Sequence, residues 1–181
     1  MKIRYNFFKS LTVGISILLL TFGFVSKAWS QAGQCNAGGC TMVGTSFGSV
    51  QSTTSATFVN SVAGTWGGEY NTYNVTSGNQ YEWSLCTADG AVSPTNDSQL
   101  TLKNTSNTTL CYSDDLCGAR PKILWTATFT GQVRVLVTQY FCATNTSSHT
   151  VRWRQVSAVP SGPVSCTNAS AYPFSGAVYT G

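Results

Sequence analysis

The stretch LCYSDDLCGARPKILWTATFTGQVRVLVTQYF, residues 110–141, decides the fold. Two runs within it, residues 122–129 and 132–140, alternate apolar and polar side chains with the period of two that marks a β-strand. Thr130-Gly131 lies between them and turns the chain. We therefore expect these two runs to form an antiparallel hairpin.

Outside this stretch, short strand candidates recur about every ten residues with turn residues between them, the spacing typical of a β-sandwich or barrel. They are residues 57–62, 70–75, 80–86, 99–103, 110–112 and 150–156. In the run 80–86, apolar residues alternate with Glu82 and Ser84, which fall on the other face. No helical periodicity appears after residue 30. The sequence predicts an all-β domain over residues 55–157, an antiparallel, jelly-roll-like β-sandwich.

Residues 1–30 have the pattern of a secretory signal peptide: Lys2, Arg4 and Lys9, an apolar run over residues 11–25, and then Ala28-Trp29-Ser30. A transmembrane anchor is the alternative, but the apolar run is short for a span. Export predicts a secreted, extracellular or cell-surface protein, and cleavage leaves no stable membrane insertion.

Removal of the leader also removes the net charge. Four of the ten basic residues lie in residues 1–30, which leaves six to balance the six acidic residues. A nucleic-acid partner requires a basic surface, so this class of partner is excluded.

The seven cysteines of an exported chain are expected to form disulfides. Closeness in sequence favours Cys35–Cys40 and Cys111–Cys117, which leaves Cys86 for Cys142 and leaves Cys166 over. Other connectivities stay open, and thiolate coordination of a metal is the rival interpretation. Residues 31–54 then form a cysteine-containing N-terminal segment, either tethered by its disulfides or a flexible linker.

Residues 158–181 begin with linker composition, and Cys166-Thr167-Asn168-Ala169 then echoes Cys35-Asn36-Ala37. This echo indicates the start of a second module. An ordinary C-terminal tail is the alternative.

Asp114 and Asp115, with Asp97 near them across the sheet, are the candidate metal ligands. Calcium binds hard carboxylate oxygens, so calcium is the expected cofactor if one is bound, and no other cofactor is indicated. A solvated acidic turn is the alternative, because aspartate caps backbone amides.

His149 is the single histidine and lies among serine and threonine residues. Neither G-x-S-x-G nor H-E-x-x-H occurs, so we expect His149 to be an exposed loop residue and predict no catalytic residues.

Most of the aromatic residues fall at inward strand positions and predict core packing. Trp66 is the exception, because glycines flank it at positions 64, 67 and 68. It is the candidate binding residue, suited to an extracellular protein or a polysaccharide.

An ordered set of features covers residues 70–156. It runs Tyr73-x-Val75-x-x-Gly78-x-x-Tyr81, Asp97-x-x-Leu100-x-Leu102, Asp114-Asp115 ahead of Ile123-x-Trp125, Gly131-x-Val133-x-Val135-x-Val137 and Val151-Arg152-Trp153. This set resembles the bacterial pre-peptidase C-terminal domain, a small β-sandwich appended to secreted peptidases and other exported proteins. The sequence departs from that family in its cysteine-rich loop around Asp114.

The resemblance implies a non-catalytic accessory or binding module of a larger extracellular protein, with a role in adhesion, substrate targeting or export. Two alternatives stay open. One is the N-terminal part of a secreted hydrolase whose catalytic domain follows Gly181, and the other is a tandem-repeat structural surface protein.

Overall fold

The computed structural model of the chain describes residues 32–94 and 97–156. The predicted leader, residues 1–30, and the C-terminal residues 158–181 lie outside this part. The elements in chain order are β1 (Thr45–Ser46), β2 (Val59–Asn60), β3 (Thr65–Gly67), β4 (Glu69–Val75), β5 (Gln80–Ser84), η1 (Thr87–Asp89), β6 (Ser98–Asn104), β7 (Thr109–Ser113), β8 (Lys122–Thr126), β9 (Gly131–Gln139), η2 (Tyr140–Cys142), β10 (Asn145–His149) and β11 (Arg152–Val156). No helix among the described residues is long and apolar enough to cross a membrane.

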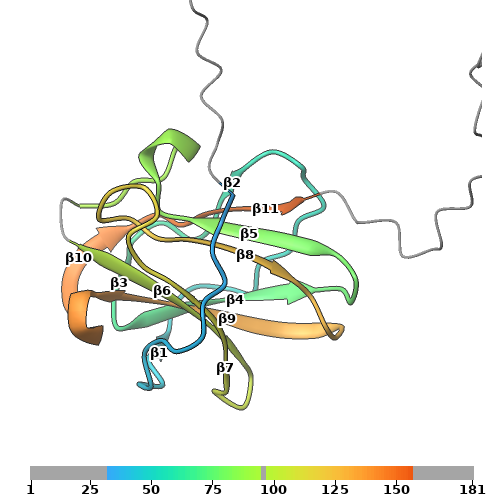
Figure 1. Cartoon of the computed structure of the whole chain (residues 1–181), viewed down its shortest axis with the longest axis horizontal. Helices are drawn as coiled ribbons and strands as arrows, with labels where there is room; N and C mark the ends of the chain where they lie inside the picture. The colour runs from blue at the N-terminus through green and yellow to red at the C-terminus, as the bar shows by residue number, and fades with distance from the viewer. Residues whose placement is uncertain (1–31, 95–96, 157–181) are drawn as a thin grey trace, which may run out of the picture.

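The strands form two main sheets that face each other as a β-sandwich (Figure 1). The five-stranded sheet has the order β1-β4-β9-β6-β7, and the four-stranded sheet has the order β2-β11-β5-β8. A small ladder of β10 and β3 lies at one end. The all-β prediction is therefore confirmed, whereas a jelly-roll-like connection of the strands stays a prediction.

The core consists of the apolar side chains that the alternating strands turn toward the space between the sheets. Trp83 on β5 lies directly opposite Trp153 on β11, and their rings stack with centroids 6.4 Å apart. Tyr73 comes from β4 in the other sheet and meets the Trp153 ring edge-on at 4.7 Å. These three rings therefore join the two sheets across the core.

The predicted hairpin of residues 122–129 and 132–140 is wrong. β8 pairs with β5 in the four-stranded sheet, whereas β9 pairs with β4 and β6 in the other sheet. The connection after β8 crosses between the sheets beside the connection from β4 to β5. The Ala127 amide donates to the Asn79 carbonyl, and the Gly78 amide donates to the Ala127 carbonyl, both at 2.8 Å. This crossing places the apolar faces of β8 and β9 opposite each other instead of side by side.

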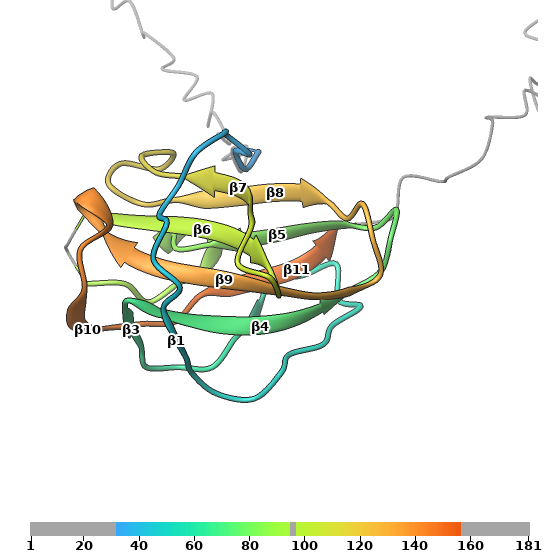
Figure 2. The same cartoon turned by 90° about the horizontal axis from the view of Figure 1, so that it is seen from below.

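The N-terminal segment is part of the fold. Gln34 forms backbone hydrogen bonds with β8, and Asn36 forms them with Tyr112 on β7. The chain then crosses the outer face of the five-stranded sheet, where the Cys40 amide donates to the Thr101 hydroxyl, and reaches β4 as β1 (Figure 2). We call residues 34–46 the N-terminal strap. It covers polar side chains of β6 and β9 that would otherwise face solvent.

Three disulfides join residues that are distant in sequence: Cys35–Cys111, Cys40–Cys142 and Cys86–Cys117. All three predicted pairings, Cys35–Cys40, Cys111–Cys117 and Cys86–Cys142, are therefore wrong. The prediction used closeness in sequence, but the strap brings Cys35 beside β7 and Cys40 beside η2. Two of the disulfides consequently attach the strap to the sandwich.

Peptide mapping of the unreduced protein should recover these three cross-links, because tryptic cleavage after Lys103 separates the two cysteines of each pair onto different peptides. A reduced sample is the control, in which the linked peptides separate. Recovery of a Cys35–Cys40 or Cys111–Cys117 link would contradict the placement of the strap.

Candidate functional site

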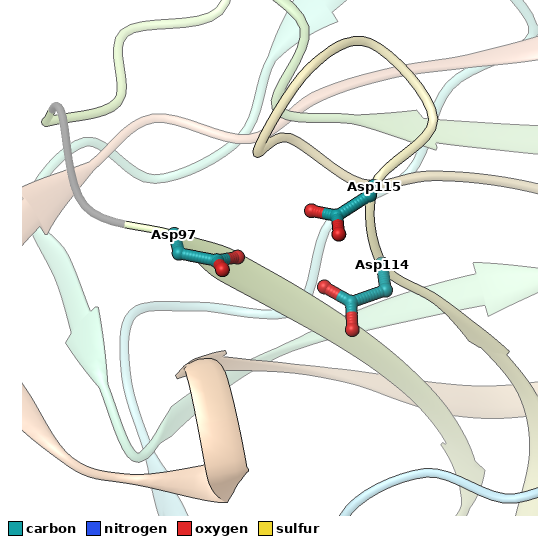
Figure 3. A group of neighbouring side chains, drawn as sticks. All are labelled: Asp97, Asp114 and Asp115. Carbon is teal, nitrogen blue, oxygen red and sulfur yellow. The ribbon is translucent and has the colours of Figure 1, made fainter.

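Three aspartates meet at one end of β6 and β7. Asp97 precedes β6, and Asp114 and Asp115 follow β7. These strands pair antiparallel, with Leu100 opposite Ser113, so the start of one lies beside the end of the other. The carboxylates point toward one another, and one oxygen from each lies within 4.8 Å of the others (Figure 3). The structure thus brings together the three residues that the sequence singled out.

The carboxylates of the cluster are only partly hydrogen-bonded by the described residues. Asp114 Oδ2 accepts hydrogen bonds from Gln99 Nε2 at 2.9 Å and from the Tyr112 hydroxyl at 2.8 Å. The Oδ1 atoms of Asp97 and Asp114 are buried and have no hydrogen-bond partner within the described residues. Burial, followed by the charges of Asp115 and Asp114, raises the pKa of Asp97 above its ordinary value, and Arg120 opposes the rise. A cation bound here would relieve this repulsion.

Trp66 lies on the short strand β3, which pairs with β10. Its side chain is 46% exposed and lines an open groove of about 570 Å³. A Cβ atom on Gly67 or Gly68 would lie within 2.8 Å of side-chain atoms of Asn145 or Thr144. The two glycines therefore let β3 lie closely against the segment that starts β10, and this approach forms the groove wall.

His149 is fully buried, so the expectation of an exposed loop histidine is wrong. It ends β10, and its Nδ1 lies 2.9 Å from the Ser93 hydroxyl, whereas its Nε2 has no hydrogen-bond partner within the described residues. Burial, and then the charge of Arg120, lowers the pKa of His149 from 6.5 to about 4. The histidine is therefore neutral at physiological pH. Its burial was not predicted because its neighbours in the sequence are serine and threonine residues, which suggest exposure.

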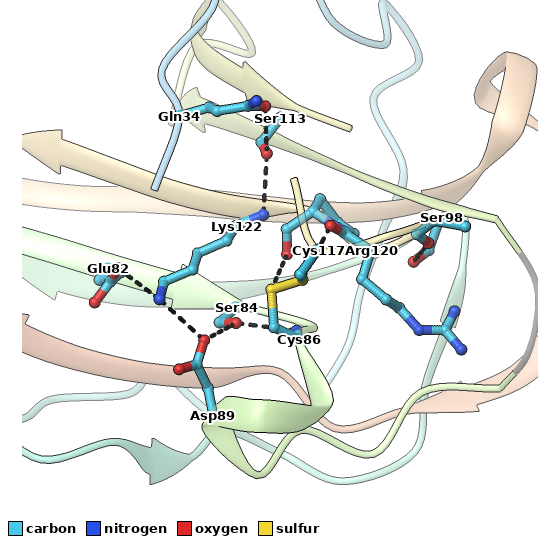
Figure 4. The surroundings of a disulfide bond; sticks show 12 residues. Gln34, Glu82, Ser84, Cys86, Asp89, Ser98, Ser113, Cys117, Arg120 and Lys122 are labelled. Atoms are coloured by element: carbon cyan, nitrogen blue, oxygen red, sulfur yellow. Dashed lines mark hydrogen bonds and ion pairs between the residues drawn. A yellow bond between two sulfur atoms is a disulfide. The ribbon is translucent and has the colours of Figure 1, made fainter. Parts of the chain in front are cut away.

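The polar face of β5 is also buried, although alternation alone places Glu82 away from the core. Lys122 Nζ lies 3.1 Å from Glu82 and 3.1 Å from Asp89 (Figure 4). On the other side of the carboxylate, Arg154 binds Glu82 at 2.6 Å. The Phe58 ring covers this network, with its centroid 5.4 Å from Lys122 Nζ and 4.4 Å from the Arg154 guanidinium carbon. No pattern in the sequence predicts this network, because Glu82, Asp89, Lys122 and Arg154 come from four separate segments. Glu82 and Asp89 therefore have a structural role, as the acidic partners of Lys122 and Arg154 in buried ion pairs.

The described residues define a disulfide-bonded β-sandwich with an acidic cluster at one end and an exposed tryptophan groove. The family model described as "Domain of unknown function (DUF8695)" matches residues 60–158, which is more than half of the 181 residues. The chain belongs to this family.

No curated protein matches the chain. Among solved structures, it is similar to the pre-peptidase C-terminal domain of a collagenase from Bacillus anthracis, with 14% sequence identity and a TM-score of 0.38. The match covers 59% of this chain and 94% of that domain. This similarity is too distant to define the fold, which rests on the strands and sheets described above.

Stability should fall as the pH drops from about 6.5 toward 4. Because the folded-state pKa of His149 lies below the unfolded value, the unfolded chain binds more protons in this range. A shift of this size corresponds to about 3 kcal/mol of unfolding free energy lost on the acid side. Urea unfolding at several pH values measures the loss.

The matched control is His149→Gln, which keeps a polar side chain but cannot be protonated in this range. Subtraction of its pH profile from that of the parent isolates the histidine from the opposing contribution of Asp97, whose raised pKa destabilises the fold as the pH rises. Identical profiles for parent and variant would contradict the assignment.

Proposed function

We propose that this chain is a non-catalytic binding module of an extracellular protein, with a role in adhesion or substrate targeting. The Trp66 groove carries the proposal, because it presents an exposed indole on a strand of the fold. Three disulfides support an oxidising, extracellular location. The resemblance of residues 70–156 to a secreted accessory module points the same way.

The internal roles of the ionisable residues also favour binding over catalysis. A Ser-His nucleophile needs a third group that orients the histidine, but the second ring nitrogen of His149 has no partner among the described residues. The neutral, buried imidazole instead packs inside the fold beside Ser93. Glu82 and Asp89 are engaged in buried ion pairs. A catalytic domain after Gly181 stays an alternative for the whole protein.

The purified chain should not hydrolyse casein or gelatin, since its histidine is buried away from substrate. Release of soluble peptides, measured against a collagenase as positive control, tests this expectation. Proteolysis that disappears in His149→Ala, while the variant keeps its folded circular dichroism spectrum, would overturn the non-catalytic function.

We also propose a calcium site at Asp97, Asp114 and Asp115 as a second, structural function. The observation that favours it is a pair of buried carboxylate oxygens, Oδ1 of Asp97 and of Asp114, inside a cluster of three carboxylates. Neither oxygen has a hydrogen-bond partner among the residues that the structure describes. Calcium takes six to eight oxygen ligands, so water or backbone carbonyls would complete the shell. The cation would join the start of β6 to the loop after β7.

Millimolar calcium should raise the melting temperature of the chelator-treated protein by several degrees through preferential binding to the folded state. The increase should vanish in Asp114→Asn/Asp115→Asn. This variant should be at least as stable as the parent without calcium, because it removes like-charge repulsion. A parent protein with the same melting temperature in calcium and in chelator would remove the metal site.

A further inference from the structure

The groove beside Trp66 has a distinctive lining. One wall comes from β3 and the start of β4, another from the residues around the start of β10, and the third from β1 of the N-terminal strap. The lining residues are Thr45, Trp66, Gly67, Gly68, Glu69, Thr144, Asn145 and Thr146. One flat aromatic ring is thus surrounded by hydroxyl, amide and carboxylate groups.

Trp66 differs from the other tryptophans of the described residues. Trp83 and Trp153 are at most 1% exposed and Trp125 is 7% exposed, whereas Trp66 is 46% exposed. An indole left partly in water forgoes part of the free energy that burial of a large aromatic side chain would give. Its surface is therefore available for a ligand that offers a flat apolar face.

The polar groups of the groove fall into two sets. Glu69 Oε2 accepts a hydrogen bond from the Trp66 amide at 2.7 Å, and Asn145 Oδ1 accepts from the amides of Gly67 and Ser147 at 3.3 and 2.9 Å. These contacts fix the backbone that carries the indole. The exposed hydroxyls of the three lining threonines make no hydrogen bond within the described residues. They are free to exchange water for ligand hydroxyls.

The charge of the lining selects among ligands. Glu69 is its single ionisable side chain, and the lining contains no lysine or arginine. A carboxylate repels sulfated or uronic acid polymers, and it accepts hydrogen bonds from neutral hydroxyl groups. A sugar ring combines an apolar face of C–H groups with a rim of hydroxyls, which matches an indole ringed by hydroxyl and amide groups.

We propose that the Trp66 groove binds a neutral polysaccharide chain, with one sugar ring stacked on the indole. This inference rests on the proposed binding function and names its ligand class. The groove is open to solvent, so a polymer can pass across it and present an internal unit. The disulfide-held strap and the close packing at Gly67 and Gly68 keep the walls in place before binding, which lowers the entropic cost of association.

The test is binding of the purified chain to a panel of neutral polysaccharides, namely cellulose, chitin, xylan, starch and a β-1,3-glucan, with alginate as the anionic comparison. Sedimentation with insoluble polymers and affinity electrophoresis with soluble ones measure the affinity. We expect at least one neutral polymer to be bound and alginate not to be. Trp66→Ala should weaken this binding at least tenfold, and Trp66→Phe should retain most of it.

Phe141→Ala is the matched control, because Phe141 is 82% exposed but does not line the groove. Its affinity should equal that of the parent. Binding should also protect the exposed tryptophan from acrylamide quenching in the parent, and this protection should be absent in Trp66→Phe. Unchanged melting temperatures would show that the variants are folded.

The outcomes distinguish a failure of the proposed ligand class from a failure of the proposed binding function. No binding to any neutral polymer, preference for alginate, or equal binding by Trp66→Ala overturns the inference about the groove. A peptide ligand whose binding requires Trp66 overturns the sugar assignment and leaves the binding function standing. Release of soluble sugars from the polymer would overturn the non-catalytic function itself.

Discussion

The packing of Trp153 against Trp83 and Tyr73 is the contact on which the rest of the structure depends. Two of these rings belong to adjacent strands of one sheet and the third reaches them from the other sheet. Burial of such large apolar surfaces supplies the main driving force for bringing two sheets together. Once the sheets face each other, their ends and edges are fixed in space. The acidic cluster and the tryptophan groove both lie at these ends and edges of the sheets.

The disulfides connect this core to the surface features. Cys40–Cys142 joins the strap to the segment that precedes β10, so Thr45 and Thr144, which lie just after these cysteines, line the same groove. Cys86–Cys117 similarly ties the loop that follows Asp115 to the end of β5. Covalent links restrict the unfolded chain and hold loops that few apolar contacts would otherwise order. Both candidate sites therefore depend on cross-links between distant segments.

The candidate sites were predictable to different degrees. Asp97, Asp114 and Asp115 could be grouped because neighbouring antiparallel strands bring their ends together. Trp66 could be singled out by its flanking glycines, but its groove partners on β1 and before β10 have no sequence pattern that links them to it. The burial of His149 was missed because its polar neighbours in the sequence suggest exposure, whereas the folded chain buries it with its Nδ1 beside the Ser93 hydroxyl. The local sequence shows which residues lie next to a side chain along the strand. It does not show which distant segments pack over that side chain.

The sequence alone determined the all-β class, the positions of the longer strands and the apolar faces that form the core, because strand periodicity is a local property of the chain. Only the tertiary structure decided that β8 and β9 lie in opposite sheets, that the strap covers one outer face and that Phe58 covers the ion pairs on the other. It also decided which cysteines meet. These outcomes depend on long-range packing, in which each segment is placed by the burial and hydrogen bonding of segments far away in sequence.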